Sequence, residues 1–170
     1  MQFSNFAHLE RWEGLRLKAY RDVGGIWTIG YGHTGPDVYA GKTITVEQAA
    51  DLALVDIEEA SDAVNRGVKV PITQNQFDAL VSLTYNIGVG AFARSTCLRR
   101  LNQRDFDGAA EALTWWNKVK GRVVDGLVNR RNAEKELFLT PDKPIDKPTD
   151  TETKFKALVE EFIEKLKELL

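Results

Sequence analysis

Residues 13–34 decide the fold, and they read EGLRLKAYRDVGGIWTIGYGHT. Up to Tyr20 apolar and polar residues alternate, and after the pair Gly24-Gly25 a second β-rich run extends from Ile26 to Tyr31. Alternation with a period of two on both sides of a glycine pair is typical of a β-hairpin. The sequence therefore predicts a β-hairpin here, with a third short strand near residues 38–42.

The segment before the hairpin has a helical spacing instead. It carries apolar residues that would share one side of a helix, namely Phe3, Phe6, Leu9 and Trp12. This spacing predicts a helix over residues 3–12. Glu13, followed by Gly14, would then stand at a helix terminus.

After the hairpin the pattern is helical. Two stretches have the Thr-x-x-Gln spacing of a capping box, Thr45 to Gln48 and Thr73 to Gln76, and they open helices that end at Gly67 and Gly88. Further helices are predicted over residues 91–101, 105–115 and 127–139. The expected fold class is α+β, mainly α, with a small β-hairpin lobe and a helical lobe on either side of a cleft.

The composition changes after residue 139, so residues 1–139 are expected to form the main domain. Residues 140–152 hold three prolines among polar residues, which predicts a semi-stiff linker. Residues 153–170 are predicted to form an amphipathic helix whose apolar stripe could dock on the main domain, join copies of the chain, or lie on a membrane or outer-envelope surface. Four lysines against five acids from Glu152 onward argue against anionic lipid, so we favour docking or self-association.

The composition also excludes several functional classes. The 170 residues include a single cysteine, Cys97, and no Cys/His set with zinc spacing, so neither an internal disulfide nor a metal is expected. We expect Cys97 to be a buried structural thiol. No stretch reaches the roughly 20 apolar residues of a membrane span, and the N-terminus lacks a signal pattern. Cytoplasmic synthesis without stable membrane insertion is therefore expected.

Two carboxyl groups near the hairpin could carry chemistry. Glycoside hydrolysis needs one carboxyl that stays protonated, to donate to the leaving oxygen, and one that is ionised, to activate water. Glu13 beside Trp12 could be the acid, and Asp22 beside Arg21 and two glycines could be the base. Thr28 would lie across the hairpin from Asp22, where its hydroxyl could hold the same water. Spacing alone is weak evidence, because most acidic residues are solvated surface groups.

These residues belong to a longer pattern. The frame Glu13-x8-Asp22-x5-Thr28, followed by IGYGHT, resembles the signature of the phage lysozymes, glycoside hydrolase family twenty-four. The resemblance continues through PITQNQFDALVSLTYNIG at residues 71–88, WWN at residues 115–117 and GLVNRRNAEKELF at residues 126–138. It covers about residues 3–139, and motifs of this length in this order are highly specific.

The resemblance implies an endolysin, an endo-acting muramidase that lyses the host cell. Such an enzyme hydrolyses the β-1,4 bond between N-acetylmuramic acid and N-acetylglucosamine in bacterial peptidoglycan, with inversion at the anomeric carbon and without a cofactor or metal. Glu13 would protonate the glycosidic oxygen, while Asp22 and Thr28 would hold water on the opposite face of the sugar.

The resemblance also implies weaker candidates for substrate binding or support. Arg130 matches a family arginine that pairs with the catalytic glutamate, although it could equally be one more exposed helix arginine. Tyr85 and Asn86 match positions that face the cleft and could contact sugar, but Tyr85 could also belong to the core. We interpret His33 as a structural hydrogen-bonding histidine, since the mechanism already has its acid and its base.

The biological setting stays open at this point. We expect the enzyme to wait in the host bacterial cytoplasm until a holin lets it reach the wall. Alternatives are a virion-associated lysozyme and a non-catalytic peptidoglycan-binding module, the latter disfavoured by the intact Glu-Asp-Thr set. Residues 94–135 hold ten Lys/Arg against five Asp/Glu and could attract an anionic polymer, peptidoglycan or nucleic acid. Solvated helix faces are the simpler interpretation, and no nucleic-acid recognition motif is present, so no nucleic-acid partner is expected.

Overall fold

The structure is a computed structural model that describes residues 1–5 and 11–142. Half of the predicted helix over residues 3–12, most of the predicted linker and the whole predicted C-terminal helix lie outside the described residues. Residues 3–5 are not helical, whereas Arg11 and Trp12 are. The described residues divide into a sheet unit, residues 4–5 and 11–55, and a helical unit, residues 1–3 and 56–142.

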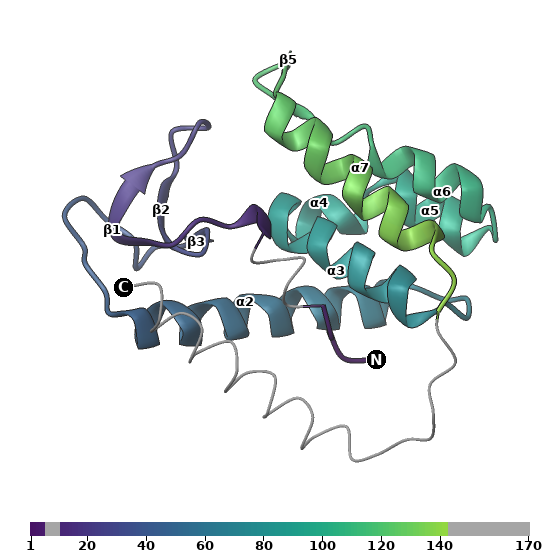
Figure 1. The fold of residues 1–170 in the computed structure, drawn as a ribbon, viewed down its shortest axis with the longest axis horizontal. Helices are drawn as coiled ribbons and strands as arrows, with labels where there is room; N and C mark the ends of the chain where they lie inside the picture. The colour runs from purple at the N-terminus through teal and green to yellow at the C-terminus, as the bar shows by residue number, and fades with distance from the viewer. Residues whose placement is uncertain (6–10, 143–170) are drawn as a thin grey trace. The chain divides into compact units, whose positions relative to one another are not determined.

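A three-stranded antiparallel sheet forms most of the sheet unit. Its order is β1 (Arg16–Arg21), β2 (Trp27–Gly30) and β3 (His33–Thr34), as Figure 1 shows. The predicted hairpin is confirmed, with Tyr20 opposite Thr28 and Arg21 opposite Trp27. In β1 alternate residues turn inward, whereas Thr28, Ile29 and Gly30 of β2 are all buried. The buried members of the core of this unit are Ala19, Ile29 and Val38, the last from the segment after β3.

The third strand lies earlier than the sequence predicts. At residues 38–42 the structure has two turns, in which the Val38 amide donates to the Gly35 carbonyl and the Lys42 amide to the Tyr39 carbonyl, each at 3.1 Å. Amides that close turns cannot donate to a strand ladder. Residues 38–42 therefore form no strand, and β2 pairs with β3 instead. Extended pairing occurs only at the end of this segment, where the Lys42 carbonyl accepts the Ala19 amide at 2.9 Å and Thr43 forms a single antiparallel bridge with Lys18.

The helices follow from the end of the sheet unit. They are α2 (Val46–Gly67), α3 (Gln74–Ile87), α4 (Val89–Ala93), α5 (Thr96–Asn102), α6 (Phe106–Leu113) and α7 (Asp125–Leu139). Both predicted capping boxes are confirmed: Thr45 exchanges two hydrogen bonds with Gln48, and Thr73 does the same with Gln76. The predicted ends of two helices are also confirmed, because Gly88 is the C-cap of α3 and α7 ends at Leu139.

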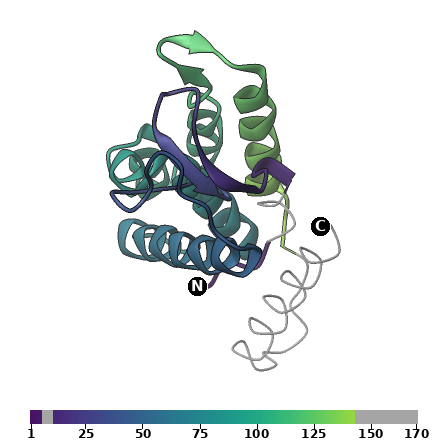
Figure 2. The same ribbon diagram turned by 90° about the vertical axis from the view of Figure 1, so that its left-hand side faces the viewer.

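The helical unit is built around α3, whose residues 77–84 are all buried. Helix α7 packs against α3 and α6, α4 packs against α3, and α5 packs against α6 (Figures 1 and 2). Among the described residues, no helix is both long enough and apolar enough to cross a membrane.

Two details of the helical unit differ from prediction. The single helix predicted over residues 91–101 is two helices, because Ser95 adopts an extended backbone and its hydroxyl accepts the Leu98 amide at 3.0 Å to begin α5. Between α6 and α7 the chain forms an unpredicted second hairpin, β4 (Lys118–Val119) and β5 (Arg122–Val123), which projects beyond the N-terminal end of α7 (Figures 1 and 2).

The first residues after α7 are attached to the helical unit. The Asp142 carboxylate accepts the backbone amides of Gln74 and Asn75, at 2.6 and 2.9 Å, and the Asn75 side chain donates to the Thr140 carbonyl at 3.0 Å. A carboxylate at this position satisfies free amides at the start of α3 and interacts favourably with the helix dipole. Residues 140–142 thus make contacts that a free linker would lack.

Candidate functional site

Asp22 stands in the turn that joins β1 to β2. Its carbonyl accepts the Gly25 amide and its amide donates to the Ile26 carbonyl, both at 2.9 Å, which closes the turn. One carboxylate oxygen, Oδ1, accepts the Ile26 amide at 2.7 Å. No described residue donates to the other oxygen, Oδ2. The turn therefore fixes the carboxylate in one orientation and leaves one oxygen to act on something else.

Two glycines allow this turn. Gly25 has a φ of +86°, in the left-handed region that favours glycine. A Cβ atom at Gly24 would lie 3.2 Å from Oδ1 of Asp22, closer than ordinary van der Waals contact. A side chain at residue 24 would thus press on the carboxylate, so the glycine pair shapes the site as well as the hairpin.

Thr28 lies close to Asp22 in the strand register, although not directly opposite it as the sequence predicts. It pairs with Tyr20, and Asp22 is two residues further along, so the two are diagonal neighbours. The Thr28 side chain is buried, and its hydroxyl donates to the Ile26 carbonyl at 3.1 Å. Since that bond uses the hydroxyl proton, the lone pairs of the oxygen remain able to accept a hydrogen bond.

Glu13 follows the helical residues Arg11 and Trp12 and is half-buried. Burial raises the pKa of the nearby Tyr20 phenol, the charge of Glu13 raises it further, Arg16 lowers it, and the charge of Asp22 raises it again. A charge effect of both carboxylates on one phenol requires both to lie near it. The sheet unit thus brings the predicted acid and the predicted base to the same side chain.

His33 has the structural surroundings expected for it. Its Nε2 lies 3.3 Å from Asp37 Oδ1, and Lys42 donates to the other Asp37 oxygen at 2.7 Å. The hydrogen bond from Lys42, and to a smaller extent the one with His33, hold the pKa of Asp37 below its usual value. Across residues 1–5 and 11–142, no group of three or more His, Cys, Asp or Glu side chains could hold a metal ion.

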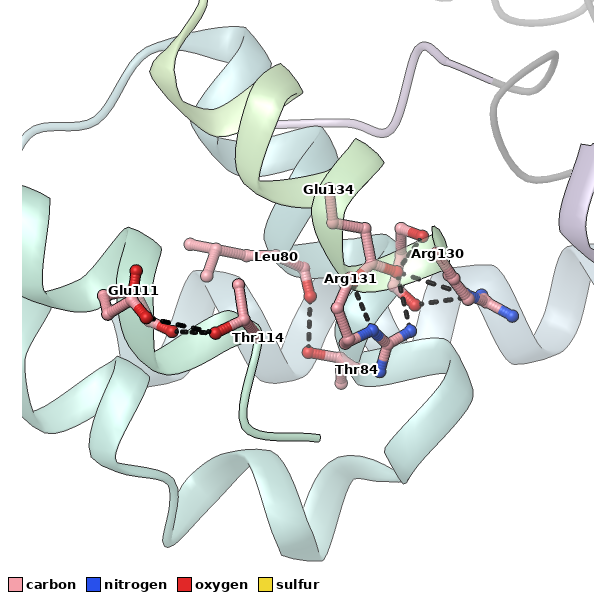
Figure 3. Close-up of polar contacts among 8 residues, drawn as sticks. Leu80, Thr84, Glu111, Thr114, Arg130, Arg131 and Glu134 are labelled. Carbon is pink, nitrogen blue, oxygen red and sulfur yellow. Dashed lines mark hydrogen bonds and ion pairs between the residues drawn. The ribbon is translucent and has the colours of Figure 1, made fainter. Parts of the chain in front are cut away.

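Arg130 belongs to a buried ionic cluster in the helical unit (Figure 3). Its Nε lies 3.1 Å from Glu134 Oε1, which also accepts Nη2 of Arg131 at 2.9 Å and the Ser82 hydroxyl at 2.7 Å. Nε of Arg131 lies 2.8 Å from the other Glu134 oxygen. Arg130 is therefore not an exposed helix arginine. Its predicted pairing with Glu13 joins residues of different units and stays a prediction.

The remaining candidates lie at the end of α3 and in α5. Tyr85 is half-buried and Asn86 is exposed, so both side chains reach the surface, and their contact with sugar stays a prediction. Cys97 is fully buried, which confirms the structural thiol. Burial, aided by the charge of Glu134, raises the pKa of Cys97 to about 12.

Sequence reasoning missed two features of these sites. One is Tyr20, which stands two residues before Asp22 at the end of β1. Residues two apart in a strand share a face, so the spacing could have placed Tyr20 beside Asp22. The other is Glu134, which stands four residues after Arg130 and three after Arg131, the spacings at which helix side chains meet. The sequence carried the spacing but gave no sign that these charges are buried.

Comparison with known proteins gives a consistent result. A family model described as phage lysozyme matches residues 10–134. The endolysin of Salmonella phage P22 is 47% identical over 146 residues, which cover 82% of this chain and 99% of the P22 protein. The endolysin of Bacillus phage B103 is 48% identical over 134 residues, and there the match covers 78% of this chain but only 51% of the relative.

A solved structure agrees with the sequence matches. The endolysin from Escherichia coli O157:H7 phage FAHEc1 superposes with a TM-score of 0.72 at 46% identity, covering 85% of this chain and 97% of the other. Its similarity extends over the sheet and the helices alike, which confirms the α+β fold class. From the family match, the identities and this structural likeness together, the chain belongs to the phage lysozyme family of glycoside hydrolases.

Proposed function

We propose that this phage lysozyme is an endolysin that hydrolyses the β-1,4 bond between N-acetylmuramic acid and N-acetylglucosamine in bacterial peptidoglycan. The observation that carries the assignment is the Asp22 turn, in which one carboxylate oxygen is fixed by a backbone amide and the other has no donor among the described residues. Such a carboxylate is held in position, and its second oxygen remains able to accept a proton.

In the proposed reaction Glu13 is the acid. Its carboxyl proton passes to the glycosidic oxygen as the bond from that oxygen to the anomeric carbon breaks, and positive charge develops on the sugar. Glu13 and the preceding Trp12 are both half-buried. The proton lost by Glu13 leaves with the departing sugar, and the carboxylate is reprotonated from solvent before the next cycle.

Asp22 and Thr28 act together on the attacking water. One water proton points to the unoccupied Asp22 oxygen, which accepts it as the new carbon–oxygen bond forms. The other water proton is donated to the Thr28 hydroxyl oxygen, whose own proton is directed to the Ile26 carbonyl. Attack on the face opposite the leaving group inverts the anomeric carbon, and fresh product should therefore show the inverted anomer by NMR.

The test is clearing of outer-membrane-permeabilised Gram-negative cells. The Glu13→Gln variant keeps the size of the side chain but cannot donate a proton, so lysis should fall by at least about 10²–10⁴-fold while the thermal melt is unchanged. Glu58→Gln, an exposed position in α2, is the matched control and should clear at the rate of the parent protein. Full lysis by Glu13→Gln would refute the assignment of the acid.

The supporting residues are tested by steady-state kinetics, which separates effects on KM from effects on kcat. If Tyr85 and Asn86 contact sugar, Tyr85→Phe and Asn86→Ala should raise KM more than they lower kcat. If Arg130 orients Glu13, Arg130→Lys should lower kcat even where the protein stays folded, because lysine cannot reproduce a planar fork of donors.

The proposed setting is release from the host bacterial cytoplasm to the cell wall through a holin. Relatives named SAR-endolysins occur in the same family, for example in Enterobacteria phage P21 at 39% identity over 127 residues, so more than one route of release exists among similar chains. Expression with and without a holin gene distinguishes the routes: rapid lysis without the holin would contradict the proposal. Self-association through residues 153–170 would appear as a dimer by sedimentation that is lost in a chain ending at Asp142.

A further inference from the structure

The β4–β5 hairpin is a short arm with an unusual charge. It carries Lys118, Lys120 and Arg122, all exposed, and the chain has no acidic residue between Glu111 and Asp125. Among the described residues none of the three cations takes part in an ion pair. Three unpaired positive charges within five residues repel one another and give the arm a positive field that an anionic partner would relieve.

The arm has a fixed shape. Val119 pairs with Arg122, and the two residues between them, Lys120 and Gly121, have φ values of 49° and 78°. Positive φ at both central positions is the geometry of the two-residue hairpin turn whose preferred residues are Asn, Asp and Gly. A lysine in the left-handed region costs free energy that those residues would avoid. Lys120 therefore places a positive charge at the tip, although the geometry of the turn disfavours a lysine there.

The cations also point in different directions. Cross-strand partners share a face, so Lys118 lies on one face of the arm with Val123, and Arg122 lies on the other with Val119, while Lys120 is at the tip. A flat anionic surface would meet only one of these faces. A mesh of flexible chains that carry carboxylates would meet all of them.

We propose that the β4–β5 arm binds the carboxylates of the peptide stems of peptidoglycan. These stems are flexible, carry free carboxylates and surround every glycan strand, so they match the charge and the geometry of the arm. The inference rests on the proposed action on peptidoglycan and adds a second contact with the wall. The exposed Val123, at 57% of its full accessible surface, supplies apolar area beside Lys118 for the aliphatic parts of the stem.

The test measures co-sedimentation with purified, detergent-washed Gram-negative sacculi, which present peptide stems but no teichoic acid or lipid. All proteins carry Glu13→Gln so that the wall is not digested during the measurement. The triple variant Lys118→Gln, Lys120→Gln, Arg122→Gln removes the charges of the arm. The control triple variant Arg94→Gln, Arg99→Gln, Arg104→Gln removes three exposed charges elsewhere in the helical unit.

The arm variant should raise Kd for sacculi by about tenfold at about 50 mM salt and less at high salt, because exposed charges are screened. The control triple variant should change Kd less than about twofold. Sacculi whose carboxylates have been converted to amides should bind the parent protein about tenfold more weakly, and the arm variant should then lose nothing further.

Several results would overturn the proposal. Equal losses in both triple variants would assign the effect to net charge, and a loss that persists on amidated sacculi would exclude carboxylates as the ligand. A loss of DNA retention with unchanged wall binding would assign the arm to nucleic acid. Unchanged melting curves exclude unfolding as the cause. Failure of the active parent chain to clear sacculi would refute the proposed function separately, since the binding measurement does not require turnover.

Discussion

Asp22 and Glu134 are both acidic residues with nearby donors, but the fold uses them in opposite ways. Asp22 lies in an open turn, where a single backbone amide holds one of its oxygens. Glu134 is fully buried: Ser82, Arg130 and Arg131 donate hydrogen bonds to its Oε1, and the Arg131 guanidinium forms an ion pair with its Oε2. The comparison teaches that two properties separate a carboxylate suited to chemistry from one that holds helices together. They are the presence of an oxygen with neither a hydrogen-bond donor nor a cation against it, and the access of solvent to that oxygen.

The largest effect is expected at Asp22. Asp22→Asn keeps an oxygen that can accept the Ile26 amide, but the amide group cannot take a proton from water. Lytic activity should fall by about 10²–10⁴-fold. The midpoint of urea unfolding should move little, because the turn is retained. A variant that lost stability in proportion to its activity would break the comparison, since Asp22 would then be structural.

The next effect is expected at Glu134, with the opposite pattern. Glu134→Gln leaves the guanidinium groups of Arg130 and Arg131 buried without their carboxylate, and removal of one partner from a buried ionic cluster costs about 3–5 kcal/mol. Urea unfolding should show this loss, whereas Glu136→Gln, an exposed position on the same helix, should change stability by less than about 0.5 kcal/mol. If the Glu134→Gln variant were stable but less active, the result would instead indicate that this cluster supports catalysis.

The contrast also marks how far the sequence can be read. The hairpin, the α3 core and both capping boxes depend on local spacing and on turn chemistry, and these were predictable. The burial of Arg130, Arg131 and Glu134 depends on contacts between α3 and α7, and an isolated charged triplet on a helix is by default a solvated one. Its role could not be inferred from residues 126–138 alone.

The strand expected near residues 38–42 and the single helix expected over residues 91–101 differ from the structure for a related reason. At residues 38–42 the backbone amides close turns, and at Ser95 a side chain caps a new helix, so one local hydrogen bond overrides the pattern of apolar residues. The arm at residues 118–123 was missed because its strands are two residues each, too short to show a period.

A smaller loss of activity is expected at Thr28, the proposed second ligand of the attacking water, than at Asp22. Thr28→Val keeps the shape of the side chain but removes the hydroxyl, and the loss of one hydrogen bond to the attacking water should lower kcat by about 10–100-fold. Thr28→Ser restores a hydroxyl at the same position and should recover most of the activity. Equal activity in the valine and serine variants would show that Thr28 only packs the turn.

Asp142 extends the comparison to a third carboxylate. Both of its oxygens accept backbone amides at the start of α3, so by the rule drawn above it is structural. Asp142→Ala should cost about 0.5–2 kcal/mol of stability, as the loss of a helix cap does, with unchanged kcat. A chain ending at Asp142 should keep this stability, whereas one ending at Leu139 should lose it.

The smallest effect is expected in the titration of Tyr20, which tests whether Glu13 and Asp22 share one site. Removing a negative charge near a phenol lowers its pKa, so Glu13→Gln should lower the pKa of Tyr20, and Asp22→Asn should lower it less. Ultraviolet difference titration measures this shift, with Tyr20→Phe identifying the signal. Because the pKa of Tyr20 is raised in the folded state, the protonated phenol contributes to the free energy of unfolding. This contribution is fully present below the unfolded-state pKa of about 10 and is lost as the pH rises through the folded-state pKa. Tyr20→Phe should therefore reduce the loss of stability at alkaline pH. If neither carboxylate variant changed the pKa of Tyr20, Glu13 and Asp22 would not lie at one site.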